Sequence, residues 1–115
     1  IGGAAINTFT LIVSATATDT EKAAALDLQG WLAENAGFMP EIKTDAEPAT
    51  ANEIIIGKPS RPECSSFTEA FAKDVYYSTA LTGTKLLIYA GTHGSISAAV
   101  AAFKEKAIEE SFKKW

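Results

Sequence analysis

The chain has 115 residues, of which 47% are hydrophobic and 21% charged, and its formal net charge is −4. This length fits one domain that can bury a core without disulfides, and the acidic balance argues against a nucleic-acid partner, because phosphate binding needs clustered Lys and Arg. No apolar run approaches the roughly 20 residues of a membrane helix. Cys64 is the only cysteine and His93 the only histidine, which excludes an internal disulfide and a Cys/His zinc site. We therefore expect no membrane span and no cofactor.

The N-terminal part of the sequence predicts a strand followed by a helix. Phe9–Ser14 is a compact β-branched and apolar run, as expected of a strand. The helix is expected from Thr20 to Ala36, with Asp19 or Thr20 as its N-cap and Gly37 as its stop. Its apolar residues form one stripe on a 3.6-residue period: Ala24, Ala25, Leu28, Trp31 and Leu32.

Two further strands are expected before residue 58. Met39–Lys43 is short and alternating, and Pro40 indicates a strand start or a sheet edge. An acidic loop with small residues follows. Glu53–Gly57 is a continuous apolar run, which is typical of a strand covered on both faces, so we expect it at the centre of the sheet.

The second half of the chain predicts a hairpin and a long helix. Lys58–Pro62 holds two prolines and is expected to be a loop, and Ser66–Lys73 has capping-box spacing for a short helix. Val75–Leu81 and Lys85–Ala90 are expected to pair as antiparallel strands. The loop GTHGS then leads to a helix from Ser95 to about Lys113, whose apolar stripe holds Ile96, Ala99, Val100, Phe103 and Ala107.

These elements predict an α/β (α+β) fold in two layers. We expect a mixed sheet of four to five strands with the two main helices on one face, all in a single domain over residues 1–115. The chain begins at Ile1 without a methionine and stops at Trp115 in a charged, helical pattern. We interpret it as a fragment of a larger multidomain protein.

Some apolar residues lie outside the core stripes of the two helices. Leu26 is expected on the opposite side of the first helix, either as a lone exposed leucine or as part of a contact with another domain. Ala101, Ile108, Phe112 and Trp115 form a second stripe on the last helix, about 90° from the first. We interpret Leu26, Ile108, Phe112 and Trp115 as interface residues.

Candidate chemistry is sparse. His93 and Ser95 lie in GTHGS, where backbone N–H groups at a helix start could hold an anion, and Arg61 in the proline loop could reach a ligand. The spacings of the nucleophile elbow, the P-loop and the dinucleotide fingerprint are absent, so a turn histidine and an N-cap serine are favoured. The carboxylate pairs fit helix ends or a polar loop: Asp19 with Glu21, Asp45 with Glu47, and Glu109 with Glu110. We predict no catalytic residue.

The order of the motifs resembles the small α/β domain that precedes the catalytic barrel in β-N-acetylhexosaminidases and α-glucuronidases. The matching segments are FTLIVSATATDTEKAAALDLQGWLAENAG, EIIIGKPSRP and VYYSTALTGTKLLIYAGTHGSISAAVAAF. One departure is Thr92-His93, where that family often carries Asp-Arg or Pro-Arg. The resemblance implies a non-catalytic accessory domain of a bacterial, secreted or cell-envelope glycoside hydrolase, with the adjacent catalytic domain as its partner.

Two other functions remain open at this level. A module that binds glycan itself would stack sugars on exposed aromatic rings, for which the chain offers Tyr76, Tyr77, Tyr89 and Trp31. A small hydrolase would act through Ser95 and His93, and it would need a third group to orient the base. The accessory domain is the preferred hypothesis.

Overall fold

The computed structural model describes residues 4–57, 77–82, 84–90 and 96–109, with the backbone alone for residues 77–82 and 90. A short 3₁₀ helix precedes the first strand. The elements then follow in the order β1 (Thr10–Val13), α1 (Asp19–Ala36), β2 (Ile42–Thr44), β3 (Glu53–Ile56), β4 (Tyr77–Thr82), β5 (Lys85–Ala90) and α3 (Ile96–Glu109).

The strands form one five-stranded mixed sheet in the order β2-β1-β3-β5-β4. β2, β1, β3 and β5 are parallel, and β4 is antiparallel to β5. The prediction that the Ile-rich run lies at the centre of the sheet is confirmed, as is the edge position indicated by Pro40, which precedes the edge strand β2.

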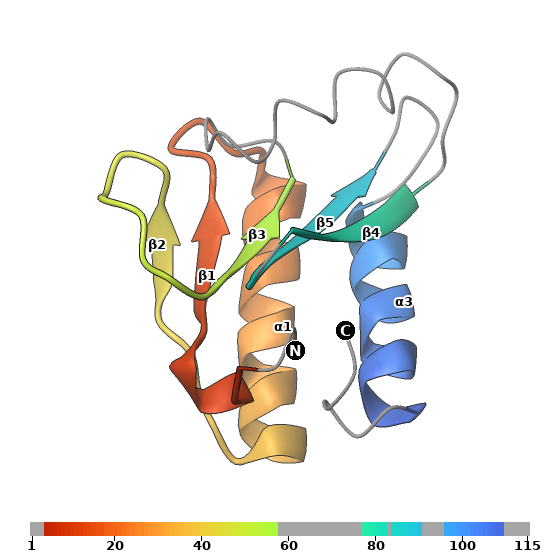
Figure 1. Ribbon diagram of the computed structural model, residues 1–115. Coiled ribbons are helices and arrows are strands. Elements are labelled where there is room, and N and C mark those ends of the chain that lie inside the picture. Colours follow the sequence, from red (N-terminus) through yellow and green to blue (C-terminus); the bar gives the residue numbers. More distant parts are fainter. Residues whose placement is uncertain (1–3, 58–76, 83, 91–95, 110–115) are drawn as a thin grey trace.

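Both helices cover the same face of this sheet, which confirms the predicted two-layer sandwich (Figure 1). α1 packs on β1 and β2, α3 packs on β5 and β4, and the two helices contact each other. The rings of Trp31 and Phe103 meet edge to face across the helix pair, with centroids 6.4 Å apart. The predicted stripes are confirmed: Ala24, Ala25, Leu28 and Leu32 on α1 and Ile96, Ala99, Val100, Phe103 and Ala107 on α3 are buried, and Trp31 packs against them.

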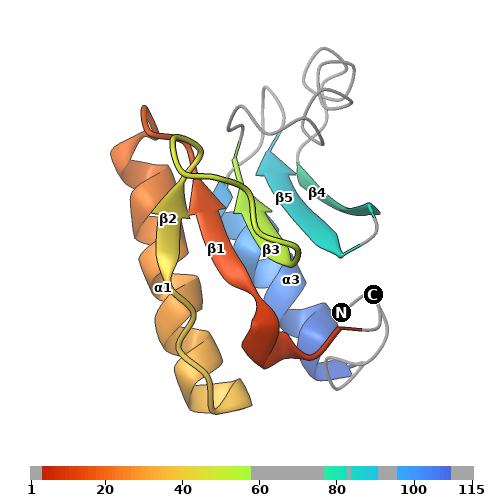
Figure 2. The ribbon, with the colours of Figure 1, turned by 60° about the vertical axis from the view of Figure 1, so that its left-hand side comes forward.

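The other face of the sheet also buries apolar side chains. Ile12, Ile55 and Leu87 are fully buried there, and Tyr89 packs against them. The segment between β2 and β3, residues 45–52, passes over β1 on this face, opposite the helices (Figures 1 and 2). The prediction that Glu53–Gly57 is covered on both faces is therefore confirmed, since Ile54 and Ile56 belong to the core beneath the helices.

The start of α1 corrects one prediction. The N-cap is Thr18, and not Asp19 or Thr20. The Thr18 side chain accepts from the Glu21 backbone N–H, and the Glu21 carboxylate accepts from the Thr18 N–H at 3.1 Å. Two donors are satisfied by this capping box, which makes Thr18 the better cap. The helix ends, as predicted, at Gly37, which has φ 68°.

Other boundaries differ by one to three residues at the strand ends. β1 is shorter than Phe9–Ser14, and β2 begins at Ile42 because Met39 and Pro40 lead into the strand without pairing. The hairpin pairs as predicted, with Ala80 opposite Leu87. The predicted loop Lys58–Pro62, the short helix Ser66–Lys73 and the GTHGS loop lie outside the described residues.

Candidate functional site

A row of polar residues crosses the sheet where three parallel strands begin. Thr10 pairs with Glu53, and Glu53 pairs with Lys85, so the first residues of β1, β3 and β5 are aligned. Because side chains alternate along a strand, these three lie on the same face as Ile12, Ile55 and Leu87, opposite the helices. The row is therefore the polar border of the second apolar cluster.

An ion pair lies at the centre of this row. The Lys85 ammonium donates to Oε1 of Glu53 at 2.9 Å. The Glu53 side chain is fully buried, and the Lys85 side chain is 14% exposed. A buried carboxylate must be paired and hydrogen-bonded to be tolerated, and the lysine meets part of that requirement.

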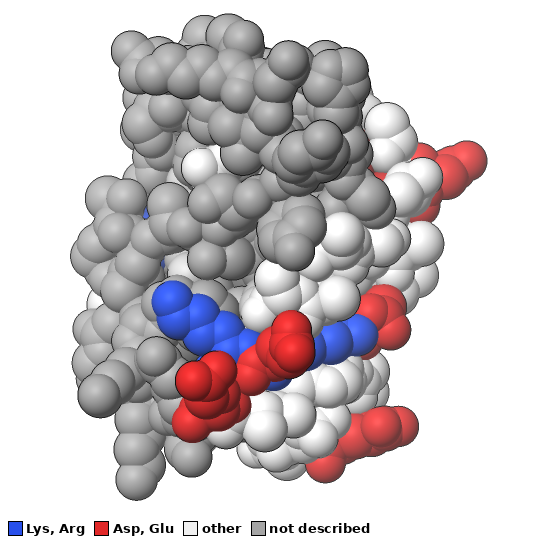
Figure 3. Space-filling model, turned by 90° about the vertical axis from the view of Figure 1, so that its right-hand side faces the viewer, with Lys and Arg blue, Asp and Glu red and all other residues white. Residues whose placement is uncertain are grey.

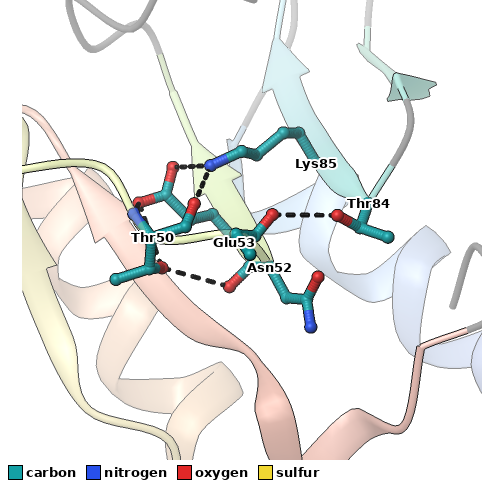
Figure 4. A network of polar contacts seen from close by, with 6 residues as sticks. Thr50, Asn52, Glu53, Thr84 and Lys85 are labelled. Carbon is teal, nitrogen blue, oxygen red and sulfur yellow. Dashed lines mark hydrogen bonds and ion pairs between the residues drawn. The ribbon is translucent and has the colours of Figure 1, made fainter.

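Thr50 completes the surroundings of the Glu53 carboxylate (Figure 4). Its backbone N–H donates to Oε2 of Glu53 at 3.0 Å, and its hydroxyl lies 3.4 Å from the same oxygen. The Lys85 ammonium also donates to the Thr50 carbonyl. Each carboxylate oxygen thus accepts at least one hydrogen bond, and the segment between β2 and β3 is joined to β5 through the ammonium.

Further hydrogen bonds extend the network along the amino ends of the strands. The Thr84 hydroxyl donates to the Ala51 carbonyl at 2.8 Å, and the Asn52 amide donates to the Thr8 hydroxyl at 2.9 Å. The Asn52 carbonyl accepts from the Thr10 N–H at 3.2 Å. Four segments are tied together here: the approach to β1, residues 50–52, β3 and the start of β5.

This network has the properties of a structural site. A general acid or a nucleophile needs an open approach for substrate, whereas the Glu53 carboxylate is enclosed and held by Lys85 and Thr50. Ligands of open α/β sheets bind outside the carboxyl ends of the strands, and this network lies at the amino ends. We therefore assign the network no reaction chemistry.

The carboxyl ends of β1, β2 and β3 carry a second set of polar contacts. Asp45, just after β2, accepts from the Ala15 N–H at 2.9 Å, and the Asp45 N–H donates to the Val13 carbonyl. The Glu21 carboxylate lies against Gly57 at the end of β3. The start of α1, where an anion could otherwise bind, is therefore occupied by the helix's own glutamate.

The residues predicted as a ligand loop cannot be placed in this geometry. Arg61 follows β3 in the chain, and His93 and Ser95 lie between β5 and α3, but all three are outside the described residues. Of the predicted interface residues, Phe112 and Trp115 are also outside them.

Leu26 and Ile108 are described, and both are exposed, with 62% and 58% of their surface accessible. The structure adds Met39, at 61%, to the large apolar residues that are exposed in the described part. The sequence predicted Met39 in a strand, and the alternation of side chains along that strand did not determine whether the Met39 side chain would be buried or exposed.

The aromatic side chains available for sugar stacking are half-buried where they are described. Trp31 is packed against the core and contacts Phe103, and Tyr89 packs on the cluster around Ile55. Tyr76 and the side chain of Tyr77 are outside the described set. Both described rings are therefore partly engaged in packing, which leaves less of each ring for stacking on a sugar.

Sequence reasoning missed the pairing of Glu53 with Lys85. A usable pattern was present, since Glu53 and Lys85 each precede three apolar residues in strands expected in one sheet. Which strands are neighbours, however, was not known from the sequence.

Neither a metal-binding group of His, Cys, Asp and Glu nor a helix able to cross a membrane occurs among the described residues. A search of known protein families and a search of curated proteins give no match to the chain.

Proposed function

We propose that the chain is a non-catalytic accessory domain of a bacterial carbohydrate-active enzyme, packed through its helix layer against a neighbouring glycoside hydrolase barrel of the same protein. The observation that supports this is the exposure of Leu26 on α1 and Ile108 on α3, at 62% and 58%. Each projects away from the buried stripe of its own helix, and the two helices lie side by side.

The charges on this layer fit a contact between domains better than a contact with a polyanion. On α3, Lys104 and Lys106 alternate with Glu105 and Glu109, and Lys104 pairs with Asp27 of α1. Figure 3 shows blue and red side chains intermingled on the described part of this side. Contacts between domains of one chain are commonly polar around a few apolar residues.

The alternative, a module that binds glycan itself, has less support. Trp31 and Tyr89 are half-buried and engaged in packing, as described above. Isothermal titration of the 115-residue chain with polysaccharide fragments should give no binding heat. A saturable heat of binding would favour the glycan module.

Thiol labelling tests the accessory-domain proposal. In a Cys64→Ser background, Leu26→Cys and Ile108→Cys are labelled in the 115-residue chain and in the complete gene product. We expect labelling at both positions to be at least about tenfold slower in the complete product, because a neighbouring domain would cover them.

Ala46→Cys is the matched control. Ala46 is exposed in the segment between β2 and β3, away from the helix layer, and its labelling should be equally fast in both proteins. Equal rates at positions 26 and 108 in the two proteins would contradict the proposal.

A further inference from the structure

The three inner parallel strands, β1, β3 and β5, do not alternate polar and apolar residues, so this pattern cannot fix their register. β1 reads TLIV, β3 reads EIII and the first four residues of β5 read KLLI, so each has one polar residue followed by three apolar ones. The apolar positions are buried on both faces of the sheet. Because both faces of these strands are apolar, a shifted register would expose few apolar side chains to water.

The pairing of β5 with β4 does not remove this ambiguity. It fixes β5 against β4, from Tyr77 opposite Ala90 to Thr82 opposite Lys85. The hairpin as a unit can still slide along β3 by two residues, because such a shift keeps the same peptide groups of β5 facing β3 and the same side chains on each face. Side-chain contacts must therefore select the register of β5 against β3.

We propose that the buried Glu53–Lys85 ion pair, with Thr50, selects the register of β3 against β5. In the observed register Glu53 lies opposite Lys85, and Ile54, Ile55 and Ile56 lie opposite Leu86, Leu87 and Ile88. Any slip places Glu53 beside an apolar residue of β5 or withdraws Lys85 from it. A charge left buried without its partner is strongly unfavourable, whereas an apolar mismatch of Ile and Leu is not.

Thr50 fixes the position of the carboxylate that Lys85 must reach. Its N–H and hydroxyl bind Oε2 of Glu53, so the carboxylate is held at the amino edge of the sheet by the segment that leads into β3. Lys85 must come to that fixed position to meet both the carboxylate and the Thr50 carbonyl. A buried polar pair that fixes register at little gain in stability is the role best attested for such pairs.

The test replaces the pair with apolar residues of similar size, in the 115-residue chain. Glu53→Met with Lys85→Met should leave a folded protein, but amide resonances of β3 and β5 should split into at least two sets. Cross-strand Hα–HN cross peaks should assign the additional set to a shifted register. A single set of resonances with the native cross peaks would overturn the proposal, and so would loss of cooperative unfolding, because the pair would then be needed for stability and not for selection.

A second variant separates the ion pair from the support of Thr50. Glu53→Gln with Lys85→Met keeps an acceptor for the Thr50 N–H and removes the cross-strand charge pair. We expect the same splitting in it, and a single native set would again overturn the proposal. Asp27→Ala with Lys104→Ala, which removes the ion pair between the helices, is the control and should give one set of resonances.

Discussion

The Glu21 carboxylate in the first turn of α1 lies against Gly57 at the end of β3 and occupies the space that a Cβ atom on residue 57 would need. Gly57 has φ 83°, a conformation that disfavours other residues as well. The same Glu21 carboxylate closes the capping box with Thr18. The contact between Gly57 and Glu21 therefore links the end of the central strand to the first turn of α1.

Gly57→Ala should lower the free energy of unfolding by about 2 to 3 kcal/mol. The left-handed backbone costs about 1 to 2 kcal/mol for alanine, and displacing Glu21 weakens a cap worth about 1 kcal/mol. Gly37→Ala is the control, because Gly37 also has a positive φ but no atom of the described residues lies within 4 Å of its added Cβ. Urea unfolding should show a smaller loss for Gly37→Ala, and equal losses would mean that the Glu21 contact contributes nothing.

Gly30→Ala should act in the opposite direction. Gly30 lies inside α1, and an added Cβ meets no atom of the described chain within 4 Å. Alanine is favoured over glycine within a helix by about 0.5 to 1 kcal/mol. The midpoint of urea unfolding should rise at an unchanged slope, and a lower midpoint would show that the position is more crowded than the structure has it.

Thr18→Ala should lower the free energy of unfolding by about 1 kcal/mol, the usual value of an N-cap side chain. Thr20→Ala, two residues later in the first turn, should change it by less than about 0.5 kcal/mol, as exposed substitutions do. Thermal unfolding of the two variants side by side distinguishes the two caps. A larger loss for Thr20→Ala would favour Thr20, one of the two caps that the sequence suggested.

The sequence predicted the fold well because its apolar residues follow the spacing expected of the helices and strands that contain them. The stripes on α1 and α3 follow helical spacing, and each of their predicted members is buried or packed on the core. β3 has three consecutive isoleucines, a run that is typical of a strand covered on both faces, and all three are buried. The cap was missed because Asp19 and Thr20 are also good capping residues, although Thr18 and Glu21 have capping-box spacing in the sequence.

The polar network was not predictable to the same degree. Glu53 and Lys85 are 32 residues apart in the chain, and their contact depends on β5, and not β4, being the neighbour of β3. Thr50 lies in a segment whose composition indicated only a loop. A strand order can be constrained by connection rules, but a particular side-chain partner requires the register, which the apolar runs themselves leave open.

Phe103→Ala should be among the most damaging single changes, with a loss of about 3 to 5 kcal/mol. Phe103 is fully buried between the helix pair and the sheet and contacts the Trp31 ring. Ile108→Ala, on the exposed side of the same helix, should change the free energy of unfolding of the 115-residue chain by less than about 0.5 kcal/mol. A large loss for Ile108→Ala would show that its side chain is packed within this chain, which would also remove the support for the interface.

Lys85→Met and Lys104→Met compare a buried ion pair with a surface one by the same substitution. Lys85→Met leaves the fully buried Glu53 without its cation and should cost about 3 to 5 kcal/mol. Lys104→Met leaves Asp27, which is 61% exposed, in contact with water, and should cost at most about 1 kcal/mol. Adding Glu53→Met to Lys85→Met should recover most of the loss in urea unfolding, since the unpaired charge is then removed. If the double variant were no more stable than Lys85→Met, the cost would come from lost packing of the lysine stem and not from an uncompensated carboxylate.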